Sequence, residues 1–564
     1  MSLASIITSA STALRNTQYA TSVAGQNVAN ADAAGYTTKT YTATATTAGV
    51  SLATGTLTRA ASVYLLKSIV SGSAAAGSAS VVDSYMQLYD AALGQVNDGG
   101  DLSSLTTAFQ TALTDLASSQ TSATRTAVVS AAGDLADSLN GLSAEIQSLR
   151  TQADQDIATA VGEVNRALQS LQGINDQIVQ ATAAGGDTAT LFDARDQALT
   201  TLSGLMGVTY FVSSDGRANV YTTSGEQLVG SQAATLNYAA AGKLGAEATY
   251  PETLGGITLN GRDITAGIAS GSLGGLISLR DDSLVEEQDA LDAFAAALIA
   301  QVNAAAADGS AYPPPTSLTG ATTLAGGDAI TASGSVRISL LASDGTVSSS
   351  ADLDLSSVST VAGLVSLLNG VSGVSASLDD SGKIVIASSN GTSGIALGAL
   401  DSDVGGQSLA AFLGLNAVFT GDDAGAIGVS SALTRNAGLL VTGVLTETGL
   451  ASGNSDAVTA LSAALDSDIG FAEAGGLSAR RSSLADYATD FVSNAAGRVS
   501  TASSAATRTS SVLEYSTSAL TNLTGVNLDE QTALMTQLQN QYQVTAQLIT
   551  TARSMFDSLL SMMN

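Results

Sequence analysis

The side chains that could do chemistry in this chain are almost all carboxylates. The 564-residue sequence contains no His and no Cys. A Ser-His-Asp or Cys-His centre therefore cannot form, and neither can a zinc site with the usual nitrogen and sulfur ligands. The sequence also has no GxxxxGK[ST] motif and no strand-linked GxGxxG motif, so a phosphate-binding loop is unsupported.

Adjacent carboxylates occur at Asp281-Asp282, Asp379-Asp380 and Asp422-Asp423, a pattern that a carboxylate-based hydrolase could use. Each pair lies among turn-forming residues, which favours a solvated loop charge. The Asp-Ser-Asp pairs at 401/403 and 466/468 lack the other ligand positions of an EF-hand calcium loop. The sequence therefore predicts no enzyme, no cofactor and no metal site, with a hydrolase as the alternative.

The amino-acid composition limits which kinds of partner the chain can bind. Asp and Glu number 49 against 20 Lys and Arg, a net charge of −29, which repels nucleic acid and anionic lipid. The first cation is Arg15, so the amino terminus does not resemble a Sec signal peptide. The longest apolar run, around Leu291–Ala300, includes Asp292 and is shorter than the ~20 residues of a membrane helix. The absence of Cys excludes disulfides and suits either a secreted or a cytosolic protein.

Apolar residues at both ends of the chain recur in steps of three and four, which places them on one face of a helix. Core helices of a bundle are the simpler interpretation. However, stripes diluted by Thr and Ala and placed at the chain ends favour a coiled coil that needs a partner. The N-terminal stripe is Leu3, Ile7, Ala10, Leu14, Thr17, Thr21, Ala24 and Val28. The C-terminal stripe is Leu534, Leu538, Tyr542, Thr545, Ile549, Ala552, Phe556 and Leu559.

In the middle of the chain the predicted secondary structure changes from helix to strand and back to helix. Residues 81–180 are helix-like, with an apolar stripe from Leu142 to Ile178. Alternating residues around Asp215-Gly216 and Ser224-Gly225 predict a β-hairpin. After Pro313–Pro315, residues 316–435 read as mainly β with one short helix at 364–368, and helix returns from 461 with a break at 524–525.

The predicted fold class is α+β multidomain, with paired terminal helices, a long helical bundle and mainly β domains inserted in the middle. The predicted divisions are 1–60 (N-terminal axial helix and loop), 61–205 (long helical bundle), 206–275 (β-hairpin region), 276–312 (helix), 313–440 (inserted outer β domain), 441–524 (returning helical segment) and 525–564 (C-terminal axial helix).

Two terminal motifs resemble the signatures of the bacterial flagellar rod, hook and hook-associated family. Gln26–Tyr36 is similar to its N-x-A-N-A-x-T-x-G-Y pattern, departing at Ala33, with the usual nearby cation displaced to Lys39. Gly525–Tyr542 is similar to its carboxy-terminal signature, with Gln531 in place of the usual Glu. In physical terms, Asn30 can end a helix, Gly35 can supply a positive φ, and Asn527 can cap the last helix.

Internal segments are most similar to the members of that family that join hook to filament. They are Leu191–Gln197, Leu276–Asp281, Leu291-Asp292, Val302-Asn303 and Phe412–Asn416. The Ser/Thr-rich stretch at 316–410 is the least similar part.

The resemblance implies an extracellular structural subunit, made in the cytoplasm and exported unfolded by the flagellar type III system, which self-assembles into a junction ring. Implied partners are further copies of itself, the hook protein, a second junction protein and an export chaperone on the C-terminal helix. A hook or rod subunit is the alternative, and a secreted adhesin a weaker one. The implied assembly residues are Leu3, Ile7, Leu14, Asn27, Val28, Asn30, Gly35, Tyr36, Asn527, Leu528, Leu534, Leu538, Tyr542, Ile549, Phe556 and Leu559.

Overall fold

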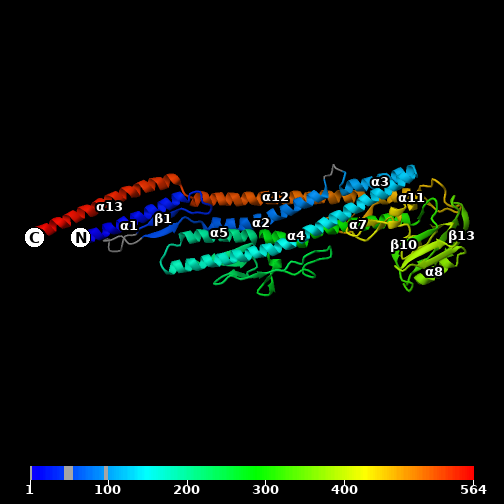
Figure 1. Cartoon of the computed structure of the whole chain (residues 1–564), viewed down its shortest axis with the longest axis horizontal. Coiled ribbons are helices and arrows are strands. Elements are labelled where there is room, and N and C mark those ends of the chain that lie inside the picture. Colours follow the sequence, from blue (N-terminus) through cyan, green and yellow to red (C-terminus); the bar gives the residue numbers. More distant parts are fainter. Residues whose placement is uncertain (1–2, 44–54, 95–98, 564) are drawn as a thin grey trace.

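The chain forms a long rod with both termini at one end and a β-rich domain at the other (Figure 1). The structure is a computed structural model and describes residues 3–43, 55–94 and 99–563. At the narrow end, α1 (Leu3–Ala29) and α13 (Leu528–Met563) lie side by side. The predicted α+β multidomain class with paired terminal helices is confirmed.

Long helices make the body of the rod. α2 packs against α12 and α6, while α4 packs against α3 and α5. The remaining helices are α2 (Val63–Leu93), α3 (Leu102–Ser118), α4 (Ser122–Ala183), α5 (Ala189–Leu205), α6 (Gly271–Ser278), α7 (Leu284–Ala307), α8 (Val361–Asn369), α9 (Leu409–Phe412), α10 (Ser431–Arg435), α11 (Asp456–Asp466) and α12 (Leu484–Thr524). The short helical turns are η1 (Thr265–Gly267), the π-helical η2 (Leu279–Ser283) and η3 (Ala437–Leu439).

The stretch predicted as helix-like at 81–180 is divided among three helices. α3 begins at the cap Asp101, whose side chain accepts the Ser104 N–H, and ends at Ser118. α4 then starts behind Thr121, which exchanges side-chain and backbone hydrogen bonds with Thr124 as a capping box. Local capping by Asp101 and Thr121 therefore divides the predicted helical stretch.

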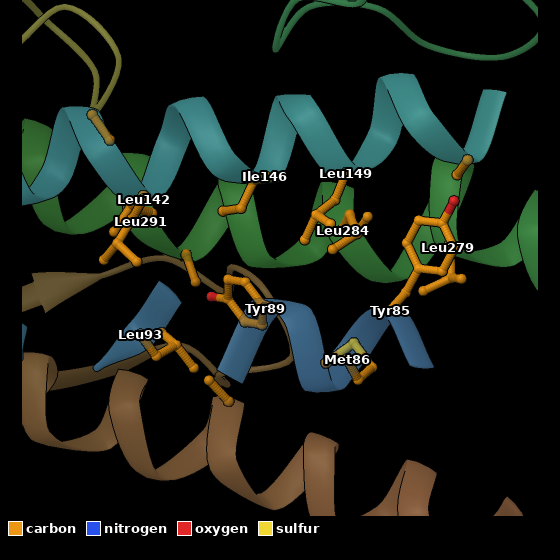
Figure 2. Close-up of a cluster of buried hydrophobic side chains, with 14 of the residues drawn as sticks. Tyr85, Met86, Tyr89, Leu93, Leu142, Ile146, Leu149, Leu279, Leu284 and Leu291 are labelled. Atoms are coloured by element: carbon orange, nitrogen blue, oxygen red, sulfur yellow. The ribbon is translucent and has the colours of Figure 1, made fainter. Parts of the chain in front are cut away.

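The bundle core is assembled from residues far apart in sequence. Figure 2 shows Tyr85 and Tyr89 of α2 pointing toward the stripe of α4 and toward η2 and α7, while Met86 and Leu93 lie on the opposite side of α2 and belong to the same core. The predicted α4 stripe from Leu142 to Ile178 is buried at almost every position, Ile174 being half-buried. Burial of this apolar face, and not helix propensity, stabilises a helix of 62 residues.

Small antiparallel sheets flank the bundle. The predicted hairpin is confirmed as a three-stranded sheet in the order β3-β4-β5, with turns at Gly216 (φ +86) and Gly225 (φ +97). The strands of this part of the chain are β1 (Lys39–Thr42), β2 (Thr56–Arg59), β3 (Val208–Val212), β4 (Ala218–Thr222), β5 (Gln227–Val229), β6 (Leu236–Asn237), β7 (Thr258–Leu259), β8 (Arg262–Asp263) and β9 (Gly309–Ser310).

The outer domain is mainly β, as predicted. Sheets β10-β15-β14 and β13-β12-β16 share one core with α8. That core ends near Leu415, whereas Val418, Phe419 and Leu440 pack in the bundle, although the predicted domain extended to residue 440. Its strands are β10 (Ser317–Thr323), β11 (Ala332–Ser333), β12 (Ser335–Leu341), β13 (Val347–Asp354), β14 (Val374–Leu378), β15 (Lys383–Ser388), β16 (Gly394–Ala399) and β17 (Asp403–Val404).

The return to the bundle is less helical than predicted. A hairpin of β21 (Ile469–Phe471) and β22 (Arg480–Ser482) separates α11 from α12, so the expectation of continuous helix from residue 461 is wrong. Phe471 stacks on Tyr487 with ring centroids 4.0 Å apart, which holds the hairpin on α12. The break at residues 524–525 is confirmed. The other strands here are β18 (Phe419–Thr420), β19 (Gly428–Val429) and β20 (Gly443–Val444).

Two helical segments, Val63–Leu93 and Gly271–Ala307, are long and apolar enough to cross a membrane by length and composition. The second segment is longer than the apolar run predicted around Leu291–Ala300, because η2 joins α6 to α7 in one helical segment. In this structure, α2 packs on α12 and α6, and α7 packs on α4 and α11. Their apolar faces thus have partners within the chain.

Candidate assembly site

The seam between α1 and α13 buries only part of the predicted stripes. Leu538 is buried, and Leu3, Ile7, Leu14 and Ile549 are half-buried. In the C-terminal stripe Ala552 is also buried and Thr545 is half-buried. The remaining large apolar side chains predicted on the C-terminal helix are exposed, with exposed fractions of 49% for Leu528, 38% for Leu534, 39% for Tyr542, 49% for Phe556 and 52% for Leu559. The pair is therefore formed as predicted, but much of its apolar surface is uncovered in the single chain.

The predicted stripe of α1 fails at its last position. Val28 is exposed, whereas the preceding residue, Asn27, is completely buried. At its last turn α1 meets both the segment that folds back as β1 and the first turn of α13. Polar contacts replace apolar ones at this point, so the three-and-four spacing no longer selects the buried residue.

Asn27 is the centre of a buried hydrogen-bond network. Its Nδ2 donates to the Lys39 carbonyl (2.8 Å) and to Gln531 Oε1 (3.0 Å). Its Oδ1 accepts the Tyr36 hydroxyl (2.8 Å) and the Lys39 N–H (3.1 Å). These four bonds use the full capacity of the amide. One side chain thus joins α1, the following loop and α13.

A carboxylate of the bundle lies beneath this network. Asp193 of α5 accepts the Thr37 hydroxyl (2.7 Å), Lys39 Nζ (2.8 Å) and Arg59 Nη1 (2.9 Å). Arg59 also pairs with Asp196, and its guanidinium lies 5.5 Å from the centre of the Phe192 ring. The Leu191–Gln197 segment therefore binds the part of the chain that follows α1.

Tyr36 completes the buried side of this cluster. Lys39 Nζ lies 3.5 Å from the centre of the Tyr36 ring, a cation–π contact. Burial, and next the Asp193 carboxylate, raise the pKa of the Tyr36 hydroxyl, so that it stays protonated and donates to Asn27. Gly35 has φ +75, and a Cβ there would collide with Gln197, which explains the glycine.

The turn between α12 and α13 is tied to the same place. Thr38 N–H donates to the Thr524 carbonyl (2.7 Å), and Thr38 Oγ1 donates to the Gly525 carbonyl (2.6 Å). The Asn527 side chain accepts the N–H groups of Asp529 and Glu530, and so caps α13 as predicted. At the other end of the site, α1 ends at Ala29, and the Asn30 N–H still bonds to the Gln26 carbonyl.

A cavity of about 500 Å³ adjoins the Asp193 cluster. Its apolar walls come from α2, β3 and α12, including Leu66, Tyr210 and Leu520. Thr37 and Asp193 are part of its polar wall. The space behind the loop after α1 is thus incompletely filled by side chains.

The other family-like segments act as internal anchors. Arg280 is fully buried and pairs with Asp154 (3.0 Å) and Asp281 (2.7 Å). Asn303 accepts the N–H groups of Val418 (2.9 Å) and Phe419 (3.0 Å), which fastens the returning chain to α7. Asn416, at φ +60, donates to the carbonyls of Ala307 and Gly309. These residues hold the domains together and are remote from the terminal pair.

The adjacent carboxylates serve local structure. Asp281 binds Arg280, Asp379 accepts the Ser381 and Lys383 N–H groups, and Asp423 accepts the Ala426 N–H. Across residues 3–43, 55–94 and 99–563, no three His, Cys, Asp or Glu side chains are grouped so that they could hold a metal ion. The arrangement as a whole offers contact surfaces and hydrogen bonds, and no reactive centre is evident in these ranges.

Sequence reasoning found Asn27, Tyr36 and the Leu191–Gln197 segment but did not connect them. It gave no role to Thr37 or Arg59, because neither belongs to a stripe or to a quoted motif. A single sequence carries no signal that 156 residues of separation between Thr37 and Asp193 end in a hydrogen bond.

In two separate parts the chain is similar to one class of proteins, those of the bacterial flagellum. Residues 86–315 match the family described as the flagellar hook-associated protein FlgK helical domain. Residues 521–562 match the C-terminal family of the flagellar basal body rod FlgEFG proteins. Both families are structural, in agreement with the prediction that the chain is not an enzyme.

Within that class, the resemblance is to flagellar hook-associated protein 1. The proteins of that name from Salmonella typhimurium and Salmonella typhi are each 27% identical over 213 residues, which cover 36% of this chain and 37% of theirs. That of Escherichia coli is 29% identical over 168 residues, 28% of this chain and 30% of its own. The chain thus matches less than two fifths of the length of these relatives. A solved structure, the flagellar hook junction protein FlgK from Burkholderia pseudomallei, covers 80% of this chain and 98% of its own at 15% identity, with a TM-score of 0.47.

Proposed function

We propose that this chain is a structural subunit of the bacterial flagellum that forms the junction ring between hook and filament. The observation that carries the proposal is the terminal helix pair, which is tied together at its root but leaves apolar stripes exposed along its length. The names of the relatives, flagellar hook-associated protein 1 and hook junction protein, support the same role.

A second stripe on α13 supports assembly between copies. Leu534, Leu548, Met555 and Met562 follow one another at multiples of seven residues, the repeat of a coiled-coil seam. Their exposed fractions are 38%, 54%, 53% and 84%, so these side chains are largely uncovered in the single chain. Gln541 occupies the seventh-residue position between Leu534 and Leu548. Exposed apolar side chains gathered on one helix in this way are typical of a contact surface. A helix of a neighbouring copy would cover it.

The distribution of charge also supports contact between the terminal helices of neighbouring copies. The chain carries a net charge of −29, so two copies repel each other over most of their surface. α1 contains Arg15 as its single charged residue, and α13 contains Asp529, Glu530, Arg553 and Asp557. The terminal helices are therefore the part of the chain where copies can approach with the least repulsion.

Export, location and the remaining partners belong to the same proposal. The chain would be made in the cytoplasm, leave through the flagellar type III system and act outside the cell between the hook protein and a second junction protein. An export chaperone would cover the C-terminal helix, since its exposed stripe would otherwise aggregate. A hook or rod subunit remains the second candidate, because the C-terminal match is to rod proteins.

Removal of residues 528–564 tests the proposal. Because the bundle core contains no residue of α13, the truncated chain should fold as a soluble monomer. It should fail to restore filaments in cells that lack the chain. Filament growth with the truncated chain would overturn the proposal. Electron microscopy of cells without the chain separates the candidates: hooks without filaments, and filament protein in the medium, indicate the junction, whereas absent hooks indicate a hook or rod subunit.

A further inference from the structure

The terminal helix pair has few links to the bundle. α13 packs against α1, α1 packs against α13 and β1, and β2 in turn meets α5. The covalent turn from Gly525 to Asn527 is a further link. The direction in which the pair leaves the bundle therefore depends on how the β1–β2 segment is held.

Two carboxylates of α5 hold that segment: within it Asp196 pairs only with Arg59, and Asp193 makes all the other bonds described next. Asp193 Oδ1 accepts Thr37 Oγ1 (2.7 Å) and Arg59 Nη1 (2.9 Å), while Oδ2 accepts Lys39 Nζ (2.8 Å) and the Thr37 N–H (3.4 Å). These donors come from the loop after α1, from β1 and from β2. Both oxygens of a bundle residue are thus bonded to the chain that carries the pair.

The same segment is also hydrogen-bonded to α1 and to the turn that leads into α13. Lys39 is bonded through its backbone to Asn27 of α1, and Asn27 is bonded to Gln531 of α13. Thr38 binds the carbonyls of Thr524 and Gly525 at the α12–α13 turn. Asp193 therefore reaches α13, more than three hundred residues away in sequence, through two intermediate side chains.

Burial makes this arrangement specific. The side chains of Lys39 and Asp193 are 1% and 9% exposed, so their charges cannot separate without a large loss of pairing energy. The adjoining cavity of about 500 Å³ shows that close packing does not fix the loop on that side. The polar cluster is left to set the geometry.

We propose that Asp193 is the positioning residue of the terminal helix pair: its carboxylate on α5 fixes the direction in which α1 and α13 leave the bundle. This inference deepens the proposed function, because a ring or tube of identical subunits requires each pair to project at the same angle. It concerns the single chain, however, and is tested without assembly.

Distance measurement between two spin labels tests the proposal. The chain has no Cys, so Gln177→Cys on α4 and Gln547→Cys on α13, both exposed positions, would carry the labels in the full-length protein. The unmodified cluster should give one narrow distance distribution. Asp193→Asn should give a distribution about twice as wide, because Lys39 loses its anion, Arg59 keeps only Asp196, and the loop is released. The melting temperature of the bundle should change little in this variant, since Asp193 lies outside the apolar core of the bundle.

Asp187→Asn is the matched control. Asp187 is exposed, six residues earlier, and its contact to the Ala189 N–H can be kept by an amide. Its distribution should equal that of the parent. Thr37→Val removes one bond to Asp193 without changing charge and should broaden the distribution to a lesser extent. An unchanged distribution in a folded Asp193→Asn protein overturns the proposal; if that variant does not fold, an unchanged distribution in Thr37→Val does so.

Discussion

The side chains of Asn27 and Gln531 meet in a buried hydrogen bond of 3.0 Å across 504 residues of sequence. The bond joins the last turn of α1 to the first turn of α13, inside two segments recognisable as family signatures. The signatures thus mark one place in the structure, the root of the terminal pair.

Replacement of Asn27 by Ala should loosen the root of the pair. Four hydrogen bonds are lost, and the Lys39 backbone, the Tyr36 hydroxyl and Gln531 are left without this partner. The expected cost is about 3 kcal/mol of local stability. Hydrogen exchange should accelerate at the amides of Val23–Asn27 and in the first turn of α13. Gln26→Ala, at an exposed position on the same turn, is the control, and equal exchange in both variants would refute the role given to Asn27.

The two stripes of α13 should respond differently to the same substitution. Leu548→Gln changes an exposed residue, so the free energy of unfolding should shift by no more than about 0.5 kcal/mol while self-association falls. Leu538→Gln places an amide in the buried seam and should weaken the pairing of α1 with α13 within one chain. Sedimentation and hydrogen exchange separate the two effects. Normal assembly of Leu548→Gln would argue against the second stripe as a contact between copies.

The bundle should be sensitive at α4 and tolerant at the exposed face of α2. Leu139 is completely buried, so Leu139→Ala should lower the free energy of unfolding by about 2–5 kcal/mol. Leu88→Ala makes the same chemical change at a residue that is 48% exposed and should have a small effect. Denaturant titration of both variants measures the difference. Similar losses would mean that the core described around α4 is wrong.

The bundle should become less stable as pH rises from about 4.5 toward neutrality. Burial raises the pKa of Glu287, and burial likewise raises the pKa values of Asp289, Asp292 and Asp308. The folded state therefore binds these protons more tightly than the unfolded state, and the free energy of unfolding falls as the pH passes through the raised values.

Glu287→Gln removes one of these groups and should flatten the dependence of stability on pH over that range. Glu514→Gln, at an exposed position of α12, should leave it unchanged. Thermal melting between pH 4.5 and 7 provides the measurement. A Glu287→Gln profile that parallels the parent would show that Glu287 does not contribute to the slope.

Elements that follow from local chemistry could be predicted from the amino-acid sequence alone. The spacing of Leu142–Ile178 predicted the buried face of α4, and Asp215-Gly216 and Ser224-Gly225 predicted the turns of the β3–β5 sheet. Periodicity and positive-φ glycines act over a few residues, so a single chain displays them directly. The terminal stripes predicted a helix pair for the same reason.

Which polar residues meet became clear only from the folded chain. Val28 fits the three-and-four spacing and is exposed, while Asn27 breaks it and is buried, because the last turn of α1 is held by hydrogen bonds to Tyr36, Lys39 and Gln531 and not by an apolar stripe. Asp193 likewise accepts hydrogen bonds from Thr37, Lys39 and Arg59, because the folded chain brings the segment after α1 against α5. Hydrogen bonds and ion pairs depend on where the folded backbone brings their atoms, and in this chain that place is fixed by contacts hundreds of residues apart.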